Sequence, residues 1–128
     1  MKKGIIALTV SFLAVSAAAQ QPVSADRFAD AVNHWNKEHG AQTYERYKPD
    51  RFREIADNIV AYQNADGGWP KNLDMLARLD PDSVKAALKP RHRLSTLDNA
   101  NVYTQVEYLS NVYLLTGDTL YRNSARRG

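Results

Sequence analysis

Residues 64–72 read Asn-Ala-Asp-Gly-Gly-Trp-Pro-Lys-Asn, a stretch whose residue types suggest chemistry more than folding. Its two adjacent glycines allow positive φ angles and close backbone approach, so they interrupt the helical pattern that precedes them. Trp69 offers a flat ring, while Lys71 and Asn72 add a cation and an amide that donates and accepts hydrogen bonds. Such a set suits the binding of an acidic sugar. The alternative is a helix-ending loop in which Trp69 fills the core, since buried tryptophans are common.

A carboxylate and an amide stand side by side at Asp98 and Asn99, where a long helix is predicted to begin. Either side chain could accept a hydrogen bond from a free amide of the first helical turn, a contribution of about 1 kcal/mol. The same two side chains also offer hard oxygen ligands of the kind that Ca²⁺ binds. From spacing alone, the helix cap is the favoured interpretation.

Three segments carry a family resemblance by their order and approximate spacing. They are Gly-Gly-Trp-Pro-Lys-Asn at 67–72, Thr-Leu-Asp-Asn leading into Tyr-Thr-Gln at 96–105, and Tyr-Leu-Leu-Thr-Gly-Asp at 113–118. Together they resemble the pectate lyases of polysaccharide lyase family 10, over residues 46–128. The resemblance implies an α/α toroid built from antiparallel helical hairpins, of which this chain is expected to be a truncated, amino-terminal fragment.

The resemblance also implies roles for individual side chains. In the family the matching Asp-Asn lies in the substrate cleft near calcium and the scissile uronate, which reverses the preference for a helix cap. Asp98 is therefore predicted to act in catalysis and, together with Asn99, to bind Ca²⁺. The expected substrate-binding side chains are Trp69, Lys71 and Asn72, with the core alternative still open for Trp69.

The implied reaction is β-elimination on polygalacturonate or pectin, which gives unsaturated oligogalacturonides. Calcium and basic side chains neutralise the uronate carboxylate and acidify the hydrogen on carbon 5, which a base then removes. In the family the base is an arginine from a later part of the ring, and no local pattern marks an arginine of this chain as that residue. The fragment is therefore expected to be inactive alone.

Two other function classes stay open. One is a secreted, non-catalytic helical module that binds anionic glycans or a protein partner. The other is a different α/α-ring enzyme, such as a hydrolase, which would need two carboxylates about 5–10 Å apart across the sugar. The three histidines, His34, His39 and His92, have no partner at metal-ligand spacing and are assigned no chemistry.

The amino terminus has the pattern of a secretory signal peptide. Lys2 and Lys3 precede an apolar stretch over residues 4–15 and a small-residue end at 17–19. A membrane anchor is disfavoured because a span needs about 20 apolar residues. We expect cleavage after Ala19, a secreted or periplasmic bacterial protein, and no membrane association once residues 1–19 are removed.

Net charge and cysteine content exclude two further classes of protein, namely nucleic-acid-binding proteins and disulfide-stabilised proteins. The formal net charge of +3 falls when the two signal-peptide lysines leave, so a nucleic-acid partner is not expected. The chain has no cysteine, so a secreted form must fold without disulfides. The complete protein is expected to be a monomer.

Helical periodicity runs through most of residues 20–128. Helices are predicted over 25–38, capped by Ser24 or Asp26, and over 49–63, with apolar positions at three- and four-residue spacing. Two short helical pieces, divided at Asp80-Pro81, are predicted within 74–89.

The strongest predicted helix starts near Asn99. Gly117 is placed to end it and Asp118 to cap the next, which predicts an antiparallel hairpin. Thr104 and Gln105, inside this helix, are expected to support the Asp98 loop by hydrogen bonds. No stretch shows sustained strand alternation, so the predicted class is all-α.

Overall fold

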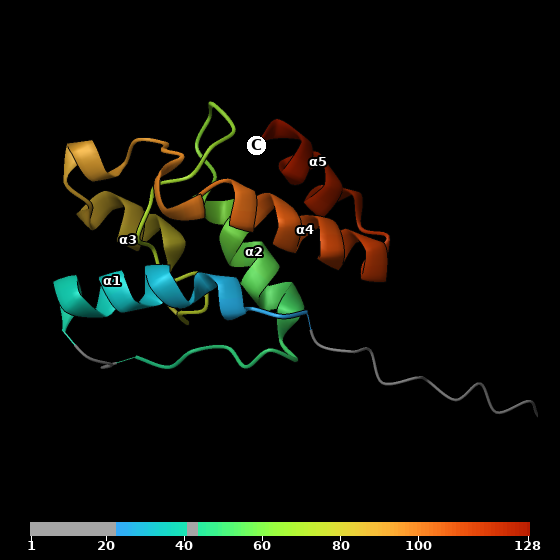
Figure 1. Cartoon of the computed structure of the whole chain (residues 1–128), viewed down its shortest axis with the longest axis horizontal. Helices are drawn as coiled ribbons and strands as arrows, with labels where there is room; N and C mark the ends of the chain where they lie inside the picture. The colour runs from blue at the N-terminus through green and yellow to red at the C-terminus, as the bar shows by residue number, and fades with distance from the viewer. Residues whose placement is uncertain (1–22, 41–43) are drawn as a thin grey trace, which may run out of the picture.

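The computed structural model describes residues 23–40 and 44–128 (Figure 1). The predicted signal peptide over residues 1–19 and its cleavage site lie outside the described residues. The elements in chain order are η1 (Asp26–Phe28), α1 (Ala29–His39), α2 (Phe52–Tyr62), α3 (Pro81–Ala87), η2 (Pro90–His92), η3 (Asp98–Ala100), α4 (Tyr103–Thr116) and α5 (Thr119–Arg127). In the described ranges, β pairing is limited to an isolated bridge between Arg46 and Ala77. The predicted all-α class is confirmed.

Helix α2 lies at the centre of the core and packs against α3, α4 and α5. Its predicted apolar stripe is confirmed, because Ile55 and Ile59 are fully buried. From the facing side α4 buries Leu109 and Val112. In Figure 1, α4 crosses α2 and α5 turns back beside α4. None of the helices in the described part of the chain is long and apolar enough to cross a membrane.

The turn between α4 and α5 forms as local sequence signals predict. Gly117 adopts a left-handed conformation with φ +68°, and its amide donates to the carbonyl of Tyr113 at 2.7 Å. The Asp118 carboxylate then accepts from the amide of Leu120 at 2.9 Å. At the other end of the fold, Ser24 Oγ accepts from the amide of Asp26 at 3.3 Å, where η1 leads into α1. The predicted cap at Asp118 is therefore confirmed. The predicted helix cap at Ser24 or Asp26 is wrong, because the N-cap residues of η1 and α1 are Ala25 and Phe28, which make no side-chain cap hydrogen bond.

The predicted helical piece before Asp80 is wrong. Its backbone carbonyls accept hydrogen bonds from other segments. The side-chain Nδ2 of Asn58 donates to the carbonyls of Met75 at 2.9 Å and Ala77 at 3.0 Å. The amide of Tyr47 donates to the carbonyl of Leu76 at 2.8 Å. Because these groups are paired with distant segments, they are not available for helical hydrogen bonds. Only the second piece forms, as α3, where the Asp80 side chain accepts from the amide of Ser83.

The predicted start of the long helix near Asn99 is also displaced, to Tyr103. Asn99, Ala100 and Val102 have positive φ angles of 57°, 56° and 68°. A right-handed helix cannot pass through such residues. Residues 98–102 therefore form a separate, irregular loop in front of α4, and this loop holds the predicted site.

Candidate functional site

The two glycines after α2 lie where the chain is closely surrounded. Gly67 has φ +94°, and a Cβ there would stand 2.0 Å from the backbone oxygen of Arg127. A Cβ on Gly68 would stand 2.6 Å from the Cβ of Ser95. Figure 1 shows this loop beside the carboxyl end of α5. The glycines are therefore required by close approach on two sides.

Trp69 lies in the core, so its predicted contact with substrate is corrected to the alternative that the sequence left open. Its side chain is fully buried, and its Nε1 donates to the carbonyl of Ile59 at 2.6 Å. A ring without an exposed face cannot stack on a sugar. The Trp69 backbone instead joins the two motifs: its carbonyl accepts from the Asn101 side chain at 2.6 Å and from the amide of Thr96 at 3.2 Å.

The loop over residues 98–102 is held by side chains of its own neighbourhood. Thr104 Oγ1 donates to the carbonyl of Ala100 at 3.0 Å, and Gln105 Nε2 donates to Asn101 Oδ1 at 2.6 Å. Asn101 Nδ2 also donates to the carbonyl of Thr96 at 2.7 Å. These contacts agree with the support expected of Thr104 and Gln105. They stabilise backbone conformations that cost on the order of 1–2 kcal/mol each in non-glycine residues.

Lys71 and Asp98 meet at the surface as an ion pair between Lys71 Nζ and Asp98 Oδ2. About half of each side chain is exposed, at 43% and 53%. Asp98 caps no helix, since α4 has no side-chain hydrogen bond at its N-cap position. The helix-cap interpretation of Asp98 is therefore wrong, and a contact between the two motifs takes its place.

This ion pair sets the ionisation of Asp98. The hydrogen bond from Lys71, and then its positive charge, hold the pKa of Asp98 below the usual value for an aspartate, and His34 adds a smaller effect in the same direction. Asp98 is therefore a carboxylate at neutral pH and a weak proton acceptor. Such a group can bind or orient a cation, and it is poorly suited to remove a proton from carbon.

A small cavity of about 20 Å³ adjoins this pair. Its lining includes Lys71, Asn72, Asp98 and Asn99, together with side chains that the sequence did not single out. The added charged residues are Arg27 and Asp30. Helical spacing could place Asp30 and His34 on one face of α1, but nothing in the sequence indicates that this face meets the 98–102 loop.

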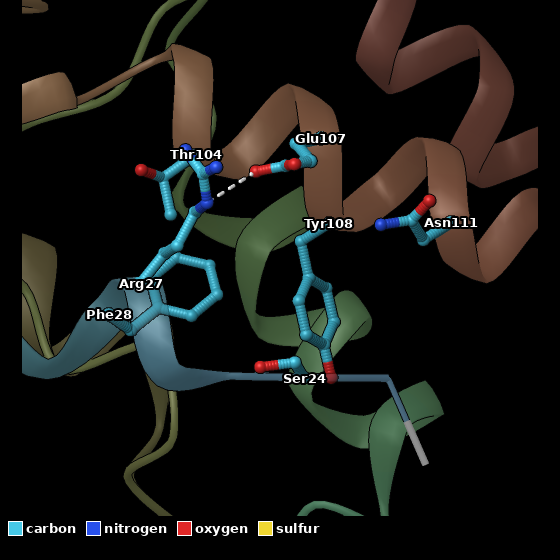
Figure 2. Close-up of a pocket in the computed structure, with 7 residues that line it drawn as sticks. All are labelled: Ser24, Arg27, Phe28, Thr104, Glu107, Tyr108 and Asn111. Carbon is cyan, nitrogen blue, oxygen red and sulfur yellow. Dashed lines mark ion pairs between the residues drawn. The ribbon is translucent and has the colours of Figure 1, made fainter. Parts of the chain in front are cut away.

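Arg27 is engaged elsewhere, as Figure 2 shows. Its Nε lies 3.0 Å from Glu107 Oε2, and its guanidinium lies over the Tyr103 ring at 5.4 Å from the ring centroid. A second cavity of about 90 Å³ lies beside this ion pair and is lined also by Tyr108, whose buried hydroxyl has no hydrogen-bond partner among the described residues. Arg27 thus ties η1 to α4.

The donor set beside Asp98 fits calcium in kind. Ca²⁺ takes about 6–8 oxygen ligands, from carboxylates, amide and backbone carbonyls and water. Asp98, Asn99 and Asp30 line one cavity, and the buried Asn72 Oδ1 in its wall receives no hydrogen bond from the part of the chain that the structure describes. Within the described ranges, however, no group of three or more His, Cys, Asp or Glu could hold a metal. The chain therefore offers part of a calcium coordination shell, which substrate or water oxygens would have to complete.

A comparison with known protein families found a match to this part of the chain. The family model for pectic acid lyase matches residues 63–128, just over half of the chain, and includes both motifs and the Lys71–Asp98 ion pair. No curated protein and no solved structure matches the chain. On the family match, the chain belongs to the pectic acid lyase family.

Proposed function

We propose that this chain carries the uronate-binding part of a pectate lyase of polysaccharide lyase family 10, which cleaves polygalacturonate by calcium-assisted β-elimination. The observation that supports this most strongly is the ion pair between Lys71 and Asp98, which brings the two family-like motifs together at the surface. The antiparallel hairpin of α4 and α5 is the unit from which an α/α toroid would be built. The amino-terminal pattern supports a secreted or periplasmic location.

In this proposal Lys71 and Asn72 bind the substrate directly. The Lys71 ammonium donates to the uronate carboxylate, which becomes its second anionic partner beside Asp98. Asn72 Oδ1 accepts a hydrogen bond from a sugar hydroxyl. Both atoms are suited to this, since Lys71 is partly exposed and Asn72 Oδ1 has no partner within the described part of the chain. Binding the carboxylate beside a cation lowers the cost of developing negative charge at carbon 5.

Asp98 and Asn99 would hold Ca²⁺. When bound, the ion supplies positive charge that acidifies the hydrogen on carbon 5. Asp98 contributes by staying ionised, because its pKa is held low by Lys71. For the same reason it is not the base. The resemblance implies an arginine for that step, and Arg27 is a poor candidate because its guanidinium is held by Glu107 and lies over the Tyr103 ring.

The test is calcium-dependent release of unsaturated product from polygalacturonate, followed by absorbance in the protein that carries this chain. We expect Asp98→Asn to lower the rate at least about tenfold at limiting calcium, a barrier increase of roughly 1.4 kcal/mol. Asp82→Asn, an exposed carboxylate on α3, is the matched control and should leave the rate unchanged. Full activity of the Asp98 variant, or activity that persists after chelation of calcium, contradicts the proposal.

The depressed pKa of Asp98 and the engagement of Arg27 also favour a second candidate, a binding module without lyase activity. This candidate predicts that the protein binds oligogalacturonates and releases no unsaturated product under any calcium concentration. The same assay therefore separates the two functions.

A further inference from the structure

A larger groove of about 470 Å³ adjoins the small cavity, because Lys71 and Asn72 line both. Its other walls come from α1, η2 and residues 94–96. The volume lies within the range of about 300–1,000 Å³ that is typical of small-molecule sites. The groove thus extends the site away from Asp98, and its volume is sufficient for one further sugar residue.

The charged side chains that line this groove are mostly cationic. Lys71 and Arg91 face a single carboxylate, Glu38. Arg91 donates from Nε to His92 Nε2 at 3.0 Å, and it forms no ion pair with a carboxylate among the described residues. The nearby Arg93 differs, since it donates to the carbonyls of Leu88 and Ala86 at 2.8 Å and so closes the end of α3. Arg91 is therefore the guanidinium that an anion in the groove would meet.

The groove wall also holds a polar atom that no described residue satisfies. Trp35 is buried, with 6% of its surface exposed, and its Nε1 has no hydrogen-bond acceptor in residues 23–40 and 44–128. Buried polar groups without partners are uncommon, and a ligand or an ordered water can satisfy them. The Trp35 donor, which the uronate at Lys71 does not use, matches a hydroxyl group of a second sugar.

His39 adds an aromatic platform. Its ring stacks on Trp35 with 3.8 Å between centroids, and its Nδ1 must donate to the Trp35 carbonyl at 3.1 Å, because a carbonyl only accepts. These contacts fix the ring orientation, and His39 is exposed and lines the groove. A flat ring held in this way is suited to pack against the apolar face of a pyranose.

We propose that this groove binds a second hexuronate of the same oligosaccharide, with its carboxylate at Arg91 and His92 and its ring against His39. The proposal rests on the proposed function for the identity of the sugar, since the residue at Lys71 and Asp98 would be the neighbouring uronate. The groove then determines how far the enzyme contacts an acidic chain beyond the residue at which it cleaves.

The experiment is isothermal titration calorimetry of the full chain with trigalacturonate and with its fully methyl-esterified form. We expect Arg91→Gln to raise the Kd for trigalacturonate about tenfold, and Arg91→Lys, which keeps the charge, to raise it less. The esterified ligand should bind weakly and respond to neither change. Arg53→Gln, an exposed arginine on α2 outside the groove lining, is the matched control and should bind as the parent does.

The outcomes separate this inference from the proposed function. If Asp98→Asn loses lyase activity while Arg91→Gln leaves the trigalacturonate Kd unchanged, the lyase proposal stands and the groove assignment is wrong. If Arg91→Gln weakens binding of the acid form alone while the protein that carries this chain releases no unsaturated product at any calcium concentration, the groove assignment stands and the lyase proposal is wrong. Equal weakening of the acid and esterified ligands also overturns the groove assignment, because it shows no recognition of the carboxylate.

Discussion

The Asn101 side chain donates to the carbonyl of Trp69 at 2.6 Å and so joins two segments that lie 32 positions apart in the sequence. The same amide nitrogen donates to the carbonyl of Thr96 at 2.7 Å, and Asn101 Oδ1 accepts from Gln105. Because Trp69 is anchored in the core, this arrangement fixes the 98–102 loop to the core. Through it, Asp98 is held opposite Lys71.

Replacing Asn101 by Ala is expected to destabilise the protein by about 2 kcal/mol, because the Thr96 carbonyl and the Gln105 side-chain amide lose their partner and the Trp69 carbonyl keeps only the bond from Thr96. Urea denaturation measures the change in the free energy of unfolding. Asn111→Ala, at an exposed position of α4, serves as the control and should change stability by less than about 0.5 kcal/mol. Equal stability of the two variants would show that the Asn101 contacts are not formed.

Gly67 and Gly117 offer a comparison between a crowded and an open left-handed glycine. Both have positive φ. A Cβ at Gly67 would meet the Arg127 carbonyl, whereas a Cβ at Gly117 would have no atom of the described residues within 4 Å. Gly117→Ala should cost about 1 kcal/mol from backbone strain alone. Gly67→Ala should cost about 2 kcal/mol more, because overpacking is added to that strain. Thermal or urea unfolding of the two variants tests the difference, and similar losses would argue against the close approach of α5.

Lys71→Gln tests the ion pair without an activity assay. The pKa of Asp98 is depressed in the folded state, so the pair contributes stability above the unfolded pKa and loses it as pH falls through the folded pKa. Removing the ammonium should therefore raise the pKa of Asp98 toward its ordinary value, as followed by NMR titration of the carboxyl carbon. The Asp66 pKa is lowered chiefly by the Ser95 hydroxyl and should not move, which makes it the internal control.

Two ion pairs join the segment around residue 45 to the segment around residue 75, and they differ in burial. Arg46 binds Asp74 at 2.6 Å, where the carboxylate is only 1% exposed, while Arg78 binds Glu45 at 2.7 Å with both side chains more than half exposed. Asp74→Asn should cost about 2 kcal/mol or more, because it leaves the partly buried guanidinium without its counter-ion.

Glu45→Gln, the matched change in the exposed pair, should cost less than about 1 kcal/mol. Chemical denaturation of both variants gives the comparison. Equal costs would mean that the Asp74 pair is screened by solvent as the surface pair is.

Local signals in the sequence were sufficient for the helices whose residues interact with near neighbours. The burial of Ile55 and Ile59 follows from their spacing in α2, and the end of α4 follows from the conformational freedom of Gly117. The all-α class and the α4–α5 hairpin depend on such short-range preferences. The types of residue in the site were also visible, since Lys71 and Asp98 stand in recognisable motifs.

Errors arose where side chains bond to backbone far away along the chain. Asn58 pairs with the carbonyls of Met75 and Ala77, so a segment with helical periodicity is not a helix. Trp69 could have been a platform or a core residue, and only the contacts around Ile59 placed it inside. The sequence determined which groups were present and where the helices would lie. The tertiary structure decided that Lys71 and Asp98 meet, because that depends on the packing of loops 27 residues apart.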